Sequence, residues 1–419
     1  MSNWRLHTPE GTTDLLPSLC MRKNELENDI LNVFGSYGYD TVEVPVMQFY
    51  DVYSTPAGKI EQEIMYKFFD SQGRITVLRP DITTAVARLV ATKMSDSREV
   101  KRLCYCGKVF RQVDSFASGQ KEFCQAGIEL IGASGDEADC EVITCAIEAL
   151  LAAGLDEFLI EIGQVEFYKG LVEEALLSAD EAEELRVLID KKDSLAIREY
   201  LREKEMKSEI KELLSELPTL FGEPEILDSI DEKIIGERAK RALTNLRNVC
   251  NLLSCIGFGD YISVDLSLVQ GINCYTGIIF KGITHGVGFS VCTGGRYDTL
   301  LGEYGFDIPA VGMAVGTDRI LNVLESEHDH DCHEHKEAAD ILVCGSDTVM
   351  KFKACTALRN SGYVVESYLG DDDAEEYAKK AGISGVLKII KKDKYTLFNT
   401  CDGSVIEGDI NEILDGGAL

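Results

Sequence analysis

The sequence predicts an α+β fold, an antiparallel sheet flanked by helices, with a small α/β domain at its C-terminal end. Three neighbouring segments lead to the sheet. Residues 264–280 place apolar runs on both sides of a polar, glycine-containing turn, as two strands do. Residues 291–300, VCTGGRYDTL, predict a tight turn at Arg296, where paired glycines let the backbone approach a ligand. Residues 309–321 predict a small-residue strand that enters a helix carrying Arg319.

Composition narrows the class of protein. A chain of 419 residues is long enough for about two or three domains. Forty-two basic against 72 acidic residues give a formal charge of −30, and such a surface repels a phosphate backbone, which argues against nucleic acid as a partner. No apolar run approaches the roughly 18 residues of a membrane span, and no secretory signal pattern is present, so we expect a cytoplasmic location and no membrane partner. The 14 cysteines include no CxxC pair, which favours reduced thiols.

The N-terminal part opens with an entry segment, residues 8–17, TPEGTTDLLP. An amphipathic helix is expected from about Ser18 to Tyr37, because four apolar residues fall on one of its faces, namely Leu26, Ile30, Val33 and Phe34. Residues 38–47, GYDTVEVPVM, favour a strand that Pro45 restricts to a sheet edge or a strand end.

A polar group lies close to the start of the next predicted helix. Residues 74–90 predict a strand, a break at Pro80 and a helix opened by Thr83 or Thr84, with Asp81 just before it. The helix N-terminus stabilises a carboxylate at that position. Asp81 can therefore cap the helix or hold a ligand ammonium, and the spacing alone does not separate these roles.

Residues 102–132 predict a strand, a loop and a second strand. Arg111 lies on the first strand beside Phe110, whereas Gln125 and Glu129 are four residues apart on the second strand and so share one face. An arginine in an apolar strand beside two polar groups on one face favours a pocket over a solvated surface charge.

The rest of the chain is predicted from composition and spacing. Helices are expected from Asp136 to Ala153 and, after a strand at residues 159–167, in a helical insertion at about residues 168–256. Residues 338–419 alternate strands and helices as a small α/β domain. Residues 326–337 are a His-rich linker. Its potential zinc or nickel ligands sit in a solvated, charged tract where we expect no metal site; they are His328, His330, Cys332, His333 and His335.

Taken in this order, the segments resemble the histidyl-tRNA synthetase family of class II synthetases. Residues 38–47 resemble signature one, which builds the family's dimer interface, residues 102–132 resemble signature two, and the Arg319 segment resembles signature three. The resemblance implies a class II core over residues 1–325, a degenerate anticodon-binding-like domain over residues 338–419, and no cofactor. It also assigns histidine-binding roles to Asp81, Thr83, Arg111, Gln125, Glu129, Gln270, Tyr275 and Tyr297.

On the ATP side the chain departs from the family's working members. Those members have an arginine before the glycine of the turn that reads QGINCYTG here, whereas this chain has Gln270, and a neutral amide does not replace a guanidinium at a phosphate. Val113 stands where the family has a glutamate, and Lys121 is the single basic residue of a loop that is basic in the family. Since Arg319 is retained, the predicted nucleotide side is degenerate.

The chain keeps the residues that bind the amino acid in the family but lacks several of those that bind ATP. In this it resembles the ATP phosphoribosyltransferase regulatory subunits of histidine biosynthesis. That family implies a non-catalytic protein that binds L-histidine and self-associates as a dimer within a hetero-oligomer. Its partner is the short-form catalytic subunit, to which it confers activation and feedback inhibition. The alternatives are a histidine–tRNA ligase, another ATP-dependent class II synthetase paralogue, and a scaffold without a ligand.

Overall fold

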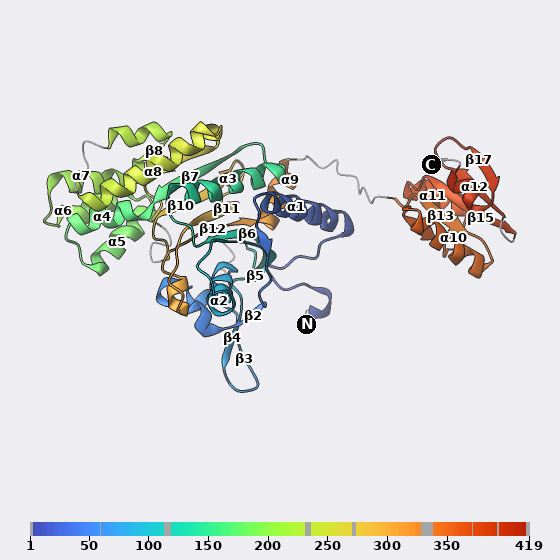
Figure 1. The fold of residues 1–419 in the computed structure, drawn as a ribbon, viewed down its shortest axis with the longest axis horizontal. Coiled ribbons are helices and arrows are strands. Elements are labelled where there is room, and N and C mark those ends of the chain that lie inside the picture. Colours follow the sequence, from blue (N-terminus) through green and yellow to red (C-terminus); the bar gives the residue numbers. More distant parts are fainter. Residues whose placement is uncertain are drawn as a thin grey trace. The chain divides into compact units, whose positions relative to one another are not determined.

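The computed structural model describes residues 3–58, 60–112, 119–230, 236–269, 274–327, 338–370, 372–391 and 394–415. Its chain forms two compact units, Met1–Asp329 and His330–Leu419 (Figure 1). The predicted His-rich metal ligands, the turn residue Gln270 and Val113 lie outside the described residues.

A nine-stranded sheet forms the middle of the first unit. In spatial order its strands are β1 (Asp40–Thr41), β5 (Lys101–Phe110), β6 (Glu122–Ile131), β12 (Ala310–Gly316), β11 (Cys292–Arg296), β10 (Ile278–Thr284), β7 (Phe158–Gln164), β9 (Ile262–Asp265) and β8 (Phe221–Gly222). Neighbouring strands are antiparallel except for β1 with β5 and β7 with β9. The predicted α+β fold is confirmed, with one parallel pair near each end of the sheet.

Helices cover the two faces of this sheet. Helices α1 (Pro17–Ser36) and α3 (Asp136–Ala152) lie on one face and α2 (Thr83–Lys93) on the other (Figure 1). Strand β6 contributes Ala126, Ile128 and Leu130 to the core with α1 and α3, and Phe123 and Ile131 to the core with α2. Because side chains alternate along a strand, the odd-numbered polar residues of β6 also face α2.

A three-stranded sheet leads into α2. It consists of β2 (Met47–Phe49), β4 (Ile75–Leu78) and β3 (Lys67–Phe69), and the β3–β4 hairpin projects from the body of the unit (Figure 1). The predicted strand over residues 38–47 shortens to β1, which has only two residues and forms the edge of the large sheet. Pro45 lies between β1 and β2, where its missing N–H breaks no strand hydrogen bond.

In the described part of the segment between β7 and β9, the chain forms five α-helices. They are α4 (Val165–Glu174), α5 (Ala179–Asp190), α6 (Ser194–Arg202), α7 (Ser208–Glu216) and α8 (Glu237–Cys255). The prediction that the preceding strand runs to residue 167 was wrong, because the Gln164 side chain accepts a hydrogen bond from the Glu166 N–H (3.0 Å) and caps α4. The segment also carries β8, an unpredicted strand that extends the sheet by pairing with β9.

Helix α9 (Thr317–Glu327) follows β12 and precedes the second unit. The second unit has a five-stranded sheet in the order β14 (Val365–Ser367), β13 (Ile341–Cys344), β15 (Gly385–Lys391), β16 (Lys394–Asn399) and β17 (Val405–Gly408). Helices α10 (Thr348–Asn360) and α12 (Ile410–Asp415) pack into one core cluster and α11 (Ala374–Ala381) into another. Within the described parts of the chain, no helix combines the length and apolarity needed to cross a membrane.

Candidate functional site

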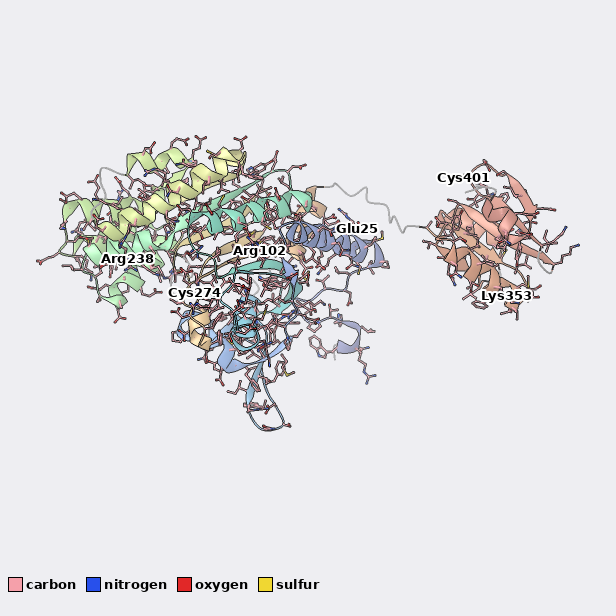
Figure 2. All side chains as sticks on the ribbon, viewed as in Figure 1. Glu25, Arg102, Arg238, Cys274, Lys353 and Cys401 are labelled. Carbon is pink, nitrogen blue, oxygen red and sulfur yellow. The ribbon has the colours of Figure 1, made fainter. Side chains whose placement is uncertain are left out.

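A cavity of about 220 Å³ lies between the start of α2 and strands β6, β11 and β12. Most of the residues predicted to bind histidine lie on its wall: Asp81, Thr83, Arg111, Gln125, Tyr275 and Tyr297. Gly294 and Gly312 of the sheet also line it, together with Cys274, whose place in the unit is shown in Figure 2. Residues far apart in the sequence therefore meet at one site. Glu129 does not reach the wall and lies behind it.

Glu129 is a buried carboxylate with two tyrosine partners. Its side chain is 1% exposed, Tyr105 donates a hydrogen bond to Oε1 (3.2 Å), and Tyr297 donates one to Oε2. Burial raises the pKa of Glu129 to about 7, although the hydroxyls of Thr83, Tyr297 and Tyr105 oppose the rise. Tyr105 was not predicted. The residue opposite Tyr105 on β6 is Gly127, and a Cβ there would lie 2.6 Å from the Tyr105 hydroxyl oxygen. A glycine in this strand is therefore the sequence feature that could have pointed to a buried large side chain opposite it.

Gly312 makes room for the Glu129 carboxylate. The two residues are opposite each other in the β6–β12 pairing, and a Cβ at Gly312 would overlap Glu129 Oε2. The absence of a side chain at Gly312 thus accommodates a protein carboxylate.

Asp81 has a capping role in the structure. Its Oδ1 accepts a hydrogen bond from the Thr84 N–H (2.9 Å) and its Oδ2 accepts one from the Thr84 hydroxyl (3.0 Å). Burial raises the pKa of Asp81, whereas these hydrogen bonds and the charge of Arg111 lower it. Asp81 also lines the cavity, so the carboxylate that caps the helix is part of the cavity wall.

Two arginines lie over the same aromatic ring. The Arg111 guanidinium is 5.5 Å and the Arg319 guanidinium 5.7 Å from the centre of Phe123, and Arg319 also lies 5.4 Å from the ring of Phe289. Arg111 Nε donates to the Pro80 carbonyl (2.8 Å). Burial, together with the neighbouring charge of Arg111, lowers the pKa of Arg319. An anion beside this pair would relieve their repulsion.

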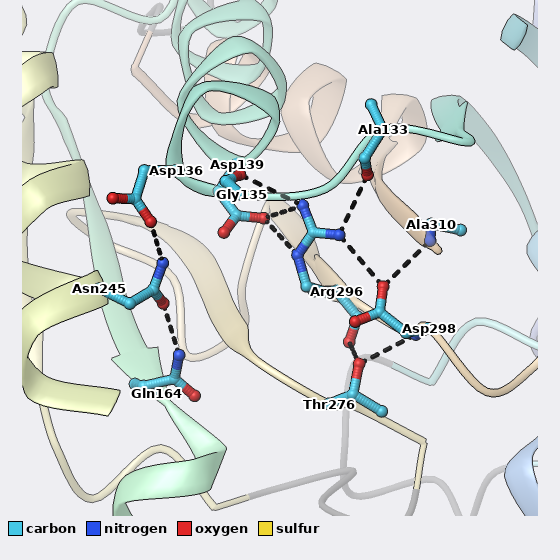
Figure 3. Close-up of polar contacts among 10 residues, drawn as sticks. All are labelled: Ala133, Gly135, Asp136, Asp139, Gln164, Asn245, Thr276, Arg296, Asp298 and Ala310. Atoms are coloured by element: carbon cyan, nitrogen blue, oxygen red, sulfur yellow. Dashed lines mark hydrogen bonds and ion pairs between the residues drawn. The ribbon is translucent and has the colours of Figure 1, made fainter. Parts of the chain in front are cut away.

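The prediction of a tight turn at Arg296 was wrong. Arg296 lies on strand β11, and its guanidinium is buried against Asp139 of α3, with Nε to Oδ1 at 2.8 Å (Figure 3). The paired glycines serve packing, because a Cβ at Gly295 would lie 2.8 Å from the ring of Tyr275. Arg296 is therefore a structural residue behind the cavity.

The Arg296 network supports the cavity wall from outside. The Arg296 carbonyl accepts a hydrogen bond from the Thr276 N–H (2.8 Å), and the Thr276 hydroxyl accepts one from the Asp298 N–H (2.9 Å) (Figure 3). These bonds hold the segment that carries Tyr275. Beside them, Asn245 of α8 joins Gln164 (2.6 Å) to Asp136 (2.6 Å), so α8 is tied to both β7 and α3.

Lys121, predicted on the nucleotide side, lies away from the cavity wall. Its backbone N–H donates to the Gly11 carbonyl (2.8 Å), which fixes the entry segment against the start of β6.

Comparisons with known sequences and structures define the class of protein. The family model described as histidyl-tRNA synthetase matches residues 11–320, and the fold resembles a histidyl-tRNA synthetase from Nostoc sp. PCC 7120 with a TM-score of 0.76 at 21% identity, covering 98% of each chain. The class is thus a class II synthetase-like protein. A protein from Acetivibrio thermocellus described as ATP phosphoribosyltransferase regulatory subunit is 43% identical over 419 residues, 99% of this chain and 100% of the relative.

A second relative with the same description, from Clostridium acetobutylicum, is 38% identical over 94% of this chain and 97% of its own. A crystal structure from Bacillus halodurans, described as an ATP phosphoribosyltransferase regulatory subunit/histidyl-tRNA synthetase, matches with a TM-score of 0.81 at 28% identity, covering 93% of this chain and 100% of that one. The chain belongs to the family of ATP phosphoribosyltransferase regulatory subunits.

Proposed function

We propose that this protein is the regulatory subunit of an ATP phosphoribosyltransferase, and that L-histidine binds in the cavity and inhibits the catalytic partner. The observation that carries the proposal is the charge arrangement of the cavity. Asp81 and Arg111 present opposite charges on its wall, as an amino acid's ammonium and carboxylate require. The buried carboxylate of Glu129 lies behind Tyr297 and provides the third feature, a partner for a protonatable ring.

The imidazole of the ligand would meet the Tyr297–Glu129 pair. The Tyr297 hydroxyl donates to Glu129, so its oxygen is free to accept a hydrogen bond from an imidazole N–H. The Glu129 carboxylate acts on the ring through Tyr297, because a hydroxyl that donates to a carboxylate is a stronger hydrogen-bond acceptor for an imidazole N–H. An apolar side chain of similar size would not gain this interaction.

The size of the cavity supports a single small ligand. Its volume of about 220 Å³ lies below the range of about 300–1,000 Å³ that drug-sized ligands occupy, which favours an amino acid over an amino acid together with a nucleotide. For regulation, a coupling of about 1–3 kcal/mol between histidine and the catalytic subunit would give several-fold to hundredfold inhibition.

Calorimetric titration with histidine and with histamine, which lacks the carboxylate, tests the binding site. Loss of a hydrogen bond to a charged group costs about 1.5–3 kcal/mol, so Arg111→Gln should weaken histidine binding by about tenfold or more. The same variant should weaken histamine binding much less than histidine binding, because histamine has no carboxylate for Arg111 to hold. Lys121→Gln, away from the cavity wall, serves as the control. Equal histidine affinities for wild type and Arg111→Gln would contradict the assignment.

A histidine-dependent, ATP-using ligase is the second candidate. It is favoured by the two guanidinium groups that lie over Phe123, one of which, Arg111, lines the cavity. Histidine-dependent exchange of labelled pyrophosphate into ATP is the distinguishing assay. Exchange that disappears in Arg319→Gln would support the ligase, whereas a folded protein without exchange would exclude it.

A further inference from the structure

Two cysteines and a glutamate meet on the face of the sheet opposite the histidine cavity. Cys106 of β5 and Cys124 of β6 are diagonal neighbours, because Cys106 pairs with Ala126 and Cys124 with Lys108. Their Sγ atoms are 3.7 Å apart. Glu27 of α1 brings a carboxylate oxygen to the pair, and the three potential ligand atoms lie within 4.8 Å of one another. The sequence separation of 18 residues between the cysteines hid this pair from spacing rules.

We propose that Cys106, Cys124 and Glu27 bind a zinc ion, with a water molecule as the fourth ligand. Zinc–thiolate bonds of about 2.3 Å in tetrahedral geometry separate two sulfurs by about 3.8 Å, which is the separation already present here. Binding would therefore need little rearrangement of the two strands. A set of two thiolates and one carboxylate favours zinc over harder cations such as magnesium.

The surroundings of the cluster meet two further requirements of a metal site. The Thr317 hydroxyl donates to Glu27 Oε1 (2.9 Å), and Asp318 Oδ2 accepts from the Cys124 N–H (2.6 Å), so contacts outside the ligand set orient both elements. The cluster also lines a cavity of about 540 Å³, which gives an ion a route of entry and leaves space for water. The ion would join α1 to β5 and β6.

Local charges set the cost of binding. Hydrogen bonding with Cys124, followed by burial, raises the pKa of Cys106, so without an ion this thiol is protonated and zinc must displace its proton. Lys23 Nζ lies 3.7 Å from Glu27 Oε1 but pairs more closely with Asp318, which partly offsets the lysine charge near the site.

The test uses the full chain in a background whose substitutions stop the His-rich tract from competing for metal. In this background the tract residues His328, His330, His333 and His335 become asparagine and Cys332 becomes serine. Cobalt(II) is titrated as a spectroscopic substitute, followed by zinc. We expect saturation at one ion per chain, a thiolate-to-cobalt charge-transfer band in the near ultraviolet, and loss of that band when zinc is added.

Variants assign the site. Thr317→Val should weaken binding by about 10- to 100-fold, as loss of a contact that orients a ligand does, and Glu27→Gln and Cys106→Ser should weaken it further. Cys255→Ser, an exposed cysteine elsewhere, is the matched control and should bind normally. If Cys106→Ser does not fold, the Glu27→Gln titration decides. Absence of the band in the folded background protein, or an affinity unchanged in Glu27→Gln, would overturn the proposal.

Discussion

Replacing Glu129 by glutamine removes a charge from behind the cavity and keeps the shape of the side chain. Burial raises the pKa of Glu129 from 4.5 to about 7, so between these values the folded protein holds a proton that the unfolded chain has released. The free energy of unfolding therefore falls as pH rises through this window. At about 1.4 kcal/mol for each pKa unit, wild type should lose about 3 kcal/mol of stability from this group between about pH 4.5 and pH 7.

The assay is urea unfolding across this pH range, followed locally by hydrogen exchange of β6, because a chain with two compact units need not unfold in one step. In Glu129→Gln the loss of stability with rising pH should be smaller by about 3 kcal/mol. Glu122→Gln is the control on the same strand, since its carboxylate pairs with Lys108 near the surface. Identical pH dependence in wild type and Glu129→Gln would refute the assigned electrostatics.

Two further substitutions test the packing around the cavity. Asp139→Asn leaves the buried Arg296 with Asp298 as its remaining ion-pair partner among the described residues, and should lower the free energy of unfolding by about 3 kcal/mol in the urea assay. A loss below about 1 kcal/mol would show that Asp298 compensates fully. Gly312→Ala should displace the Glu129 carboxylate and weaken histidine binding at least tenfold by calorimetry, whereas unchanged affinity would mean that the strand adjusts without moving Glu129.

Long, strongly patterned elements were predictable from the sequence. The face of α1 that carries Leu26, Ile30 and Phe34 is buried as expected, because helical periodicity reports the side that meets the core. Predictions failed where a nearby contact decides the backbone. The glycines before Arg296 form a strand because the rings of Tyr275 and Phe280 occupy the space beside them, and no local pattern contains those rings.

The site was predictable to the extent that it depends on strand alternation and on the family resemblance. Gln125 reaches the cavity wall, but Glu129 on the same face does not, because its depth depends on Gly312 in a strand far away in the sequence. The place of Asp81 also required coordinates, since its hydrogen bonds to Thr84 and its position on the cavity wall are set by different elements. The thiol pair on the opposite face depends on the register of β5 with β6.

The most direct test of the proposed function is the phosphoribosyl-transfer rate of the short catalytic transferase from the same organism. The rate would be measured with and without this chain while histidine is titrated into the mixture. The proposal predicts that the chain raises the rate, that histidine inhibits the complex, and that Glu129→Gln retains the activation but loses most of the inhibition. No change in the rate of a folded catalytic subunit, or equal histidine inhibition of the wild-type and Glu129→Gln complexes, would contradict it.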